Sequence, residues 1–361
     1  MLRILQVVNK MDRAGLETAL MNYYRNIDRN VIQFDFLTHR PDSGQYDEEI
    51  LALGGKIYRA PRLYPQNYLL YFKWMNKFWA EHPEYQIVHS HIDAMSYLPL
   101  LAAKKANIPV RIAHSHSTGI DKDFKYPLKR LFRRILKNVT TEEWACGKAA
   151  GDFLFCSRKF RIVPNPIEAF MYSFSPQKRS QVRKALAVAD QTVVIGHVGR
   201  FYYPKNQCFL VQIFKKYQDF NSDSKLLFIG EGELEHQVRE MVKTLELQPQ
   251  VEFLGARGDV PDIMQGLDIL VLPSIFEGVP MVGLEAQAAG LPVLLSNRIS
   301  PEVAVTESCT FLPLEESEEN WALKIDEIVQ RKERCVSPDL KQYNVQNAAP
   351  KLQKMYQELK P

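Results

Sequence analysis

The chain is poor in cysteine, with five in 361 residues. The five are scattered and odd in number, and none of their spacings is typical of a metal-binding pair: Cys146, Cys156, Cys208, Cys309 and Cys335. This scarcity excludes a small scaffold held by disulfides and argues against a cysteine-based zinc site. It predicts a reduced, cytoplasmic protein.

Long apolar runs are also lacking. No stretch approaches the roughly 18 uncharged apolar residues that a membrane span needs. The apolar run within residues 1–10 is too short for a signal peptide and has no small-residue cleavage site after it, so it is expected to form a buried strand. Any membrane contact would therefore be peripheral, at the inner face of the plasma membrane.

A strong excess of charge of one sign is absent. The formal net charge of +4 is too small to indicate a nucleic-acid partner. Hydrophobic residues at 46% and charged residues at 24% are typical of a soluble globular protein. At this length the chain can form two domains of ordinary size, each with its own core.

Short apolar runs rich in β-branched residues alternate with segments of helical period. Strands are expected at 3–8, 34–38, 56–59, 86–91, 110–115 and 161–164, and then at 193–199, 225–230, 251–254, 268–272 and 292–295. Helices are expected between them, for example at 17–28, 94–106, 205–219, 233–246 and 282–289. This alternation predicts the α/β class, with two doubly wound parallel sheets covered by helices on both faces.

The two series of strands are separated by residues 168–190, which are polar and carry no clear strand. We therefore expect an N-terminal domain at 1–168 and a C-terminal domain at 190–338. The helical pattern at 343–361 is expected to pack back on the first domain. Ligands of such sheets bind beyond the carboxyl ends of the strands, so the chemistry is expected in loops after strands, at a cleft between the domains.

Two glutamates eight residues apart, Glu277 and Glu285, flank a Gly-Val-Pro turn. Glu277 follows the expected strand at 268–272, and Glu285 falls inside the helix that begins after Pro280. Free N–H groups and the positive end of the helix dipole lie between them. This arrangement suits a polyhydroxylated ligand with negative charge, because carboxylates accept from sugar hydroxyls and a helix start favours phosphate.

The loop after the strand at 193–199 carries two cations, Arg200 and Lys205, at the start of a helix. They could converge on a diphosphate. The alternative is a pair of surface cations, although this end of a helix is mildly unfavourable for positive charge. Gly230 and Gly232 follow the next strand, where they either permit close approach to a ligand or form an ordinary strand-to-helix turn.

Gly15 lies between the first strand and the first helix, where it either brings N–H groups to a phosphate or forms a tight turn. Two histidine pairs end two of the expected strands: His89 and His91, and His114 and His116. The alternatives are metal binding and merely polar strand ends, but no carboxylate or cysteine stands at a suitable spacing for a metal. We therefore expect no metal, and hydrogen bonds to a hydroxylated ligand from His114 above all.

The segment 124–139 has an amphipathic helical pattern. Its apolar residues lie on one stripe and six lysines and arginines occupy the other side. Such a helix can rest on an anionic lipid surface, which would give a peripheral membrane contact. The alternative is a helix whose stripe faces the core and whose basic side is solvated.

Taken together, these residues resemble the retaining glycosyltransferases of family 4 over essentially the whole chain. The elements that carry the resemblance are Glu277 to Glu285 (an E-x7-E motif), Gly199-Arg200 with Lys205, Gly230-Glu231-Gly232, Phe253-Leu254-Gly255 and Gly290-Leu291-Pro292-Val293. The first domain is similar to bacterial exopolysaccharide and capsular-polysaccharide members, through residues 34–38, 46–50 and 111–116. The resemblance implies the GT-B fold, with two Rossmann-like domains.

The resemblance also implies roles for particular residues. Arg200 and Lys205 would hold the donor diphosphate, and Glu285 would bind the ribose. Glu277 would grip the donor sugar together with the backbone around Gly278, Val279, Pro280, Met281 and Val282. Ala256 and Arg257 fall where the family holds the base, and His114 matches an active-site histidine, with His116 as the second candidate. Ala14 stands where the family has the first of two glycines, so the loop before Gly15 is expected to differ in shape.

The function expected is transfer of a hexosyl or N-acetylhexosaminyl unit from a nucleotide sugar, by family habit a UDP-sugar, to a hydroxyl of a growing, lipid-linked surface polysaccharide. The anomeric configuration would be retained, and no cofactor is expected. Arg200, Lys205 and helix ends would stabilise the leaving diphosphate. Two alternatives stay open. One is a nucleotide-sugar 2-epimerase of the same architecture, and the other is an inactive partner subunit, against which the intact Arg200, Lys205, Glu277 and Glu285 argue.

Overall fold

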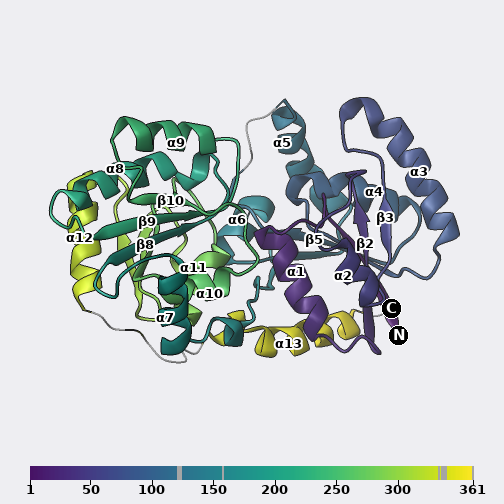
Figure 1. Ribbon diagram of the computed structural model, residues 1–361. Helices are drawn as coiled ribbons and strands as arrows, with labels where there is room; N and C mark the ends of the chain where they lie inside the picture. Colours follow the sequence, from purple (N-terminus) through teal and green to yellow (C-terminus); the bar gives the residue numbers. More distant parts are fainter. Residues whose placement is uncertain (120–123, 157, 332–333, 335–339, 360–361) are drawn as a thin grey trace. The chain divides into compact units, whose positions relative to one another are not determined.

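The computed structural model describes residues 1–119, 124–156, 158–331, 334 and 340–359 (Figure 1). The chain forms two compact units, one of Met1–Pro166 with Val345–Pro361 and one of Ile167–Asn344. The second unit thus includes residues 169–189, which the sequence patterns left outside both domains, and residues 167 and 168, which they placed in the first. The expected end of the second domain at 338 and the last two residues of the expected helix 343–361 lie outside the described residues.

The first unit contains a parallel sheet of seven strands in the order β3-β2-β1-β4-β5-β6-β7. Its strands are β1 (Leu2–Val7), β2 (Ile32–Thr38), β3 (Ile57–Arg59), β4 (Ile87–Ser90), β5 (Val110–Ser115), β6 (Glu142–Ala145) and β7 (Arg161–Ile162). Successive residues of β1 point to opposite faces, so Ile4 and Leu5 join two different apolar cores, one on each face. The sheet is therefore buried on both sides, as expected of a doubly wound fold.

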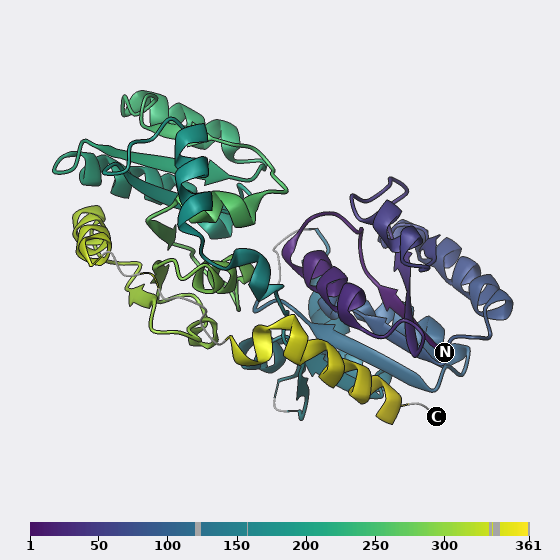
Figure 2. The same cartoon turned by 60° about the horizontal axis from the view of Figure 1, so that its bottom comes forward.

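Helices cover both faces of this sheet. They are α1 (Gly15–Asn26), α2 (Asp47–Ala52), α3 (Tyr68–Glu81), α4 (Tyr97–Lys105), α5 (Tyr126–Ile135), α6 (Lys148–Phe155) and α13 (Val345–Glu358). The C-terminal α13 lies beside α1 in Figure 2 and contributes Leu352 and Tyr356 to the same core as Leu20 of α1. The end of the chain thus completes the first unit. Among the described residues, no helix is long and apolar enough to cross a membrane.

The second unit contains a parallel sheet of six strands in the order β10-β9-β8-β11-β12-β13. Its strands are β8 (Val193–Val198), β9 (Ser224–Ile229), β10 (Val251–Phe253), β11 (Ile269–Leu272), β12 (Val293–Ser296) and β13 (Cys309–Leu312). Its helices are α7 (Pro176–Ala185), α8 (Gln207–Gln218), α9 (Glu235–Thr244), α10 (Val260–Gly266), α11 (Met281–Ala288) and α12 (Glu318–Gln330). The expected α/β class with two doubly wound parallel sheets is confirmed.

The strand order of each sheet reverses at one point. In the first unit the reversal lies between β1 and β4, and in the second it lies between β8 and β11. Loops that follow the two strands at such a point leave the sheet in opposite directions and open a crevice for a ligand. The loops after β8 and β11 are therefore the places to look for a site in the second unit.

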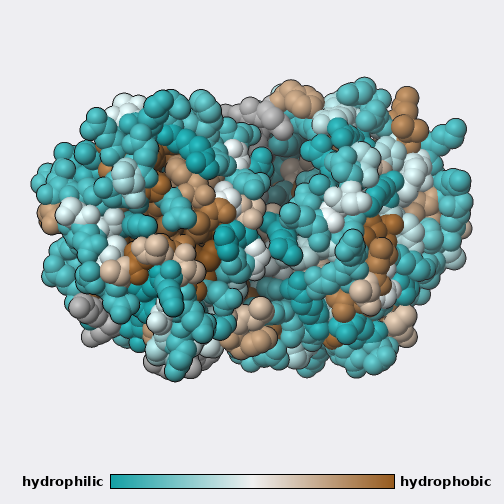
Figure 3. All heavy atoms as spheres, in the orientation of Figure 1, coloured by the Kyte–Doolittle hydropathy of each residue, from teal (hydrophilic) through white to brown (hydrophobic). Residues whose placement is uncertain are grey.

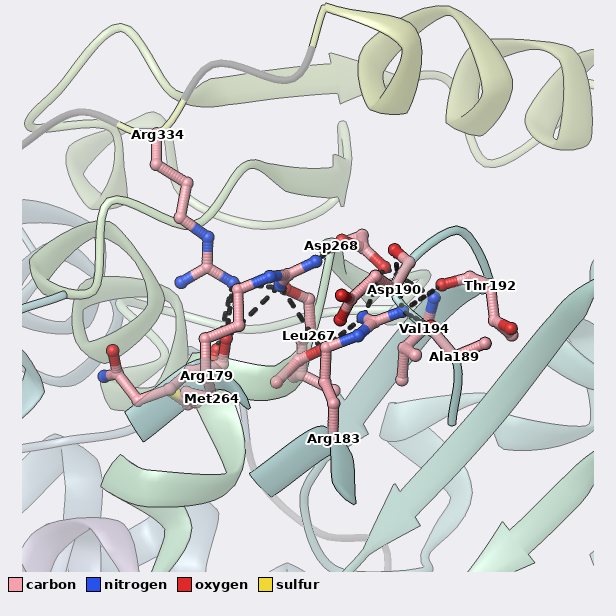
Figure 4. A network of polar contacts seen from close by, with 12 residues as sticks. Arg179, Arg183, Ala189, Asp190, Thr192, Val194, Met264, Leu267, Asp268 and Arg334 are labelled. Atoms are coloured by element: carbon pink, nitrogen blue, oxygen red, sulfur yellow. Dashed lines mark hydrogen bonds and ion pairs between the residues drawn. The ribbon is translucent and has the colours of Figure 1, made fainter. Parts of the chain in front are cut away.

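Arginines from two separate segments hold α7 and α10 together at the start of β11 (Figure 4). Arg179 and Arg183 both pair with Asp268, at 2.5 and 3.2 Å, and the same carboxylate accepts from the Val194 N–H at 2.8 Å. Arg334 donates to carbonyls at the end of α10, where helical partners are missing. This cluster is structural, because its donors are directed at backbone carbonyls and at one partly buried carboxylate.

Candidate active site

The functional site of the second unit is centred on an ion pair between the loops after β8 and β11. Lys205 Nζ lies 2.7 Å from Glu277 Oε2, and each side chain is only 12% exposed. A Lys–Glu pair held away from water is uncommon unless further polar groups surround it. Its position at the reversal of strand order identifies it as the candidate site.

The local sequence explains why Lys205 reaches Glu277. A short 3-10 turn, Tyr203–Lys205, is closed by Asn206 in the left-handed conformation at φ 57°. The Asn206 side chain donates to the Pro273 carbonyl at 3.1 Å, and the Ile275 N–H donates to the Pro204 carbonyl at 2.8 Å. These bonds fasten the β8 loop to the β11 loop. Lys205 thus owes its place to the backbone on both sides of it.

Two further polar residues belong to the surroundings of this ion pair, and the sequence patterns did not single them out. Ser274 Oγ donates to Glu277 Oε1. His197 lies inside β8 with Nδ1 2.9 Å from the Val271 carbonyl. Burial lowers the pKa of His197 to about 4. The hydrogen bond with Val271 and the charge of Glu277 oppose this change, whereas the charge of Lys205 lowers the pKa further. The only sequence signal for His197 was a lone polar residue in an apolar strand that ends at Gly199.

The N-terminus of α11 follows Glu277 directly. Pro280 is its N-cap, and no side chain of the described residues caps it. The first N–H groups of a helix have no intrahelical acceptor, and they carry the positive end of the helix dipole. The expected order of carboxylate, turn and helix start is therefore present, and it can take an anion or a hydroxyl.

Glu285 lies in the second turn of α11, as the motif required. Burial raises the pKa of Glu285 to about 7, and a hydrogen bond with the Tyr172 side chain opposes this rise. Tyr172 belongs to a short 3-10 turn, Ala169–Tyr172, in the segment that the sequence patterns left unassigned. Glu285 is thus a carboxyl group that gains or loses its proton near neutral pH.

The raised pKa of Glu285 predicts a pH effect on the stability of the ligand-free protein. An unfolded glutamate titrates near 4.5, so folding binds a proton between about pH 4.5 and about pH 7. The stabilising contribution is complete below that window and is lost as the pH rises through it, at most about 1.4 kcal/mol per pH unit. Urea unfolding of wild type and Glu285→Gln from pH 5 to 8 checks this. A constant difference in unfolding free energy between the two proteins would contradict it.

Arg200 is on the expected loop but has a different partner. Its guanidinium lies 4.0 Å from Glu233 Oε2, and the side chain is 68% exposed. It also lies over the Tyr202 ring, at 5.9 Å. Arg200 therefore remains able to turn toward a ligand, whereas Lys205 is already fixed.

The two glycines after β9 serve the chain's own backbone. A Cβ at Gly230, where φ is 136°, would lie 2.2 Å from the Gly199 carbonyl oxygen, and one at Gly232 would lie 2.3 Å from the Phe201 carbonyl oxygen. The loops after β8 and β9 are packed together, so the close approach occurs within the protein. Beyond β10, the Ala256 N–H donates to Glu231 at 3.3 Å, and Arg257 pairs with Asp259 at 2.6 Å.

The first unit gathers all four expected histidines around one small cavity at the ends of β4 and β5. The cavity has a volume of about 10 Å³, enough for about one water molecule, and Tyr356 and Asn165 also line it. His89, His91 and His114 are buried, whereas His116 is partly exposed. Residues of α1 close the cavity, but Gly15 at the start of that helix is not among them.

The ring nitrogens separate His114 from His116. Both nitrogens of His114 are occupied, by His89 at 3.1 Å and by the Val163 carbonyl at 3.2 Å. His116 contacts His91 through Nε2 at 3.0 Å, while its buried Nδ1 makes no geometric hydrogen bond with the described residues and lies beside Asn165, whose side chain opposes the lowering of the pKa of His116 by burial. Both nitrogens of His114 are therefore engaged within the protein, whereas one nitrogen of His116 faces Asn165, and the order of ligand contact expected from sequence stays a prediction.

Known proteins match the whole described architecture. The pattern of the family described as "Glycosyltransferase Family 4" matches residues 13–169, and that of "Glycosyl transferases group 1" matches residues 178–345. The putative glycosyltransferase EpsF of Bacillus subtilis is 35% identical over 329 residues, which cover 89% of this chain and 86% of that protein. The capsular polysaccharide biosynthesis glycosyltransferase CapH of Staphylococcus aureus is 23% identical and covers 99% of both chains.

Solved structures agree in fold. Alr3699/HepE of Anabaena, crystallised with UDP, has a TM-score of 0.81 and 17% identity, covering 99% of this chain and 100% of that one. The two sheets and this likeness show the GT-B fold. The chain belongs to glycosyltransferase family 4, as the sequence resemblance implied.

Proposed function

We propose that the protein is a retaining glycosyltransferase that moves a hexosyl or N-acetylhexosaminyl unit from a UDP-sugar to a hydroxyl of a growing, lipid-linked surface polysaccharide. The nucleotide is supported by the HepE structures, which contain UDP and UDP-glucose. The acceptor class is supported by an Escherichia coli relative named as a galactosyltransferase that acts on GlcNAc-diphosphoundecaprenol, 26% identical over 228 residues. The cytoplasmic side of the membrane is the corresponding location.

The Lys205–Glu277 pair is the observation that carries this proposal. Lys205 supplies a point charge to the diphosphate, and Glu277 accepts from hydroxyls of the donor sugar. The backbone at Gly278–Val282 adds the N–H groups at the start of α11. In the same proposal Arg200 swings from Glu233 to the diphosphate, while Ala256 and Arg257 adjoin the base. In the first unit, the loop at Gly15 adjoins a phosphate and the histidines contact a sugar hydroxyl.

The positive charge of this site accounts for the chemistry. Breaking the bond between sugar and diphosphate leaves negative charge on the leaving group, which Lys205, Arg200 and the α11 dipole stabilise where it forms. These groups are sufficient without a metal, so we propose metal-independent transfer. Retention through a covalent intermediate needs a second carboxylate about 5 Å from the first. We favour front-side attack, in which the leaving diphosphate takes the acceptor's proton.

Glu285 binds the two ribose hydroxyls in this proposal. Its carboxylate form accepts two hydrogen bonds, whereas the protonated form that prevails below about pH 7 accepts fewer. Nucleotide binding should therefore strengthen as the pH rises through this value.

A panel of nucleotide sugars tests the proposal. Slow hydrolysis of one donor identifies the sugar without knowledge of the acceptor, and transfer to lipid-diphosphate saccharides then identifies the acceptor. Formation of an epimer from the donor alone would favour the 2-epimerase instead. If no nucleotide shifted the melting temperature, the inactive-subunit alternative would replace the proposal.

Membrane contact is proposed through the start of α5. Most of the expected apolar stripe packs inward, with Phe132 and Leu136 buried, as the core-facing alternative required. Phe124 and Leu131 remain 72% and 49% exposed beside the basic side chains. Figure 3 shows apolar atoms where α5 begins. Exposed apolar side chains surrounded by lysines and arginines suit an anionic lipid surface, because the apolar groups can insert while the basic groups contact the headgroups.

Replacing both exposed residues should weaken this contact. We expect Phe124→Ser with Leu131→Ser to lower co-sedimentation with anionic phosphatidylglycerol vesicles about tenfold, since each lost apolar side chain removes roughly 1.5–3 kcal/mol of burial at most. Leu323→Ser, on an exposed site of the second unit, is the matched control. Equal sedimentation of the variants would refute the contact.

A further inference from the structure

Six side chains of the first unit form one continuous chain of hydrogen bonds that ends on a backbone carbonyl. Five of them are buried. The links run from His116 Nε2 to His91 Nδ1 (3.0 Å), His91 Nε2 to Gln6 Oε1 (2.8 Å), Gln6 Nε2 to Tyr356 Oη (3.2 Å), Tyr356 Oη to His89 Nδ1 (2.6 Å), His89 Nε2 to His114 Nδ1 (3.1 Å) and His114 Nε2 to the Val163 carbonyl (3.2 Å).

The carbonyl at the end fixes the direction of the first links. A carbonyl oxygen only accepts, so His114 must carry its hydrogen on Nε2. Burial lowers the pKa of the histidines well below the ordinary value, so each ring is neutral and has one hydrogen. Nδ1 of His114 is therefore an acceptor, and His89 must donate to it from Nε2.

The same logic continues through the remaining links. Nδ1 of His89 must accept the Tyr356 hydroxyl hydrogen, so the Tyr356 oxygen can only accept from Gln6. The Gln6 amide thus directs its NH₂ at Tyr356 and its oxygen at His91, which must donate from Nε2. Nδ1 of His91 then accepts from Nε2 of His116. Every link is satisfied in one direction only, and reversing any one of them would set two donors or two acceptors against each other.

One lone pair is left over, on Nδ1 of His116. This atom is buried and makes no geometric hydrogen bond with the described residues, but the Asn165 side chain lies beside it at the small cavity and opposes the lowering of the pKa of His116 by burial. We propose that the chain of hydrogen bonds holds His116 in the Nε2–H tautomer, so that Nδ1 is a permanent acceptor for a hydroxyl of a carbohydrate ligand. Gln6 and Tyr356 are positioning residues that act through His91. The ligand class rests on the proposed function, whereas the tautomers do not.

The assignment gives α13 a role in the site. Tyr356 is the only described residue of α13 in this series of hydrogen bonds, and it connects His89 to Gln6. Without its hydroxyl, Gln6 is free to turn its amide, and His91 and His116 lose their fixed direction. Helix α13 thus determines which nitrogen of His116 meets the ligand.

Nitrogen-15 NMR of the imidazoles tests the tautomers directly in the full-length protein. All four rings should show the Nε2–H pattern at pH 7.5, and EDTA should change none of them. In Tyr356→Phe, His91 and His116 should each become a mixture of the two tautomers. Tyr24→Phe, which removes a buried hydroxyl outside this series of hydrogen bonds, should leave both tautomers unchanged. An Nδ1–H pattern at His116 would overturn the proposal. So would a spectrum that shifts with EDTA, because His89, His91 and His114 lie close enough to share a metal ion.

Kinetics and ligand binding test the use of the free lone pair. Saturating UDP-glucose should shift the Nδ1 signal of His116 in the wild type. Tyr356→Phe should lower kcat/KM for transfer about five- to tenfold, the effect of one neutral hydrogen bond, whereas Tyr24→Phe, which also loses a buried hydroxyl and its stability, should leave kcat/KM unchanged. Correct tautomers with an unmoved His116 signal would overturn the ligand role alone. If the wild type bound no nucleotide sugar, the proposed function would be contradicted instead. The tautomer spectra would still show whether the proposed directions of the hydrogen bonds are correct.

Discussion

Replacing Lys205 with alanine should lower the rate of glycosyl transfer by about 10²- to 10³-fold, the usual cost of removing one preorganised charge that stabilises a leaving group. Lys205 is fixed by backbone bonds on both sides of its turn and is 12% exposed, so its charge is held in place before the donor binds. The measurement is the initial rate of UDP release from the identified donor with its acceptor. Most of the loss should be in kcat, because the charge on the diphosphate grows in the transition state.

Lys178→Ala is the matched control for this experiment. Lys178 also pairs with a carboxylate of the second unit, Asp262 at 2.7 Å, but both side chains are 50% exposed and belong to α7 and α10 rather than to the loops after β8 and β11. An exposed pair of this kind contributes little, so its rate should stay near that of the wild type. If the two lysine variants had equal activity, Lys205 would have no part in the reaction.

Glu277→Gln should reduce kcat/KM for the donor by about 10²-fold. The substitution preserves shape but removes the charge that accepts from sugar hydroxyls, and it leaves Lys205 without its counter-charge in a largely buried position. Its effect and that of Lys205→Ala should not add, because residues in contact share one interaction. The double variant should therefore be little worse than either single one.

Glu315→Gln provides the comparison for Glu277. Glu315 pairs with Arg298 on the exposed surface of the same unit, and losing that pair should leave kcat/KM unchanged. Unfolding midpoints of all variants separate a loss of fold from a loss of chemistry. Strictly additive effects of the Lys205 and Glu277 substitutions would mean that the pair does not work as a unit.

The sequence predicts most of the fold because buried parallel strands have a clear apolar pattern. Two strands were missed for physical reasons. β6 begins with Glu142 and Glu143, and the second of these is held by Arg158, so its charge conceals a buried strand. β13 is a half-exposed edge strand, and edge strands depend on a neighbouring strand more than on their own composition.

The candidate site could be located from sequence but not assembled. The spacing of Glu277 and Glu285 predicted that one carboxylate lies just before α11 and the other inside it. The contact of Lys205 with Glu277 joins residues 72 positions apart, and it depends on bonds from Asn206 and Ile275 that no local pattern reveals. Distance in sequence also hid the link between His89 and Tyr356, which are 267 residues apart.

A crystal structure of the protein with UDP-glucose tests the central claim most directly. The account predicts an oxygen of the diphosphate within about 3 Å of Lys205 Nζ, with the N–H groups at the start of α11 close by, the ribose on Glu285 and the glucose on Glu277. A nucleotide bound elsewhere, with Lys205 still paired to Glu277 alone, would contradict it.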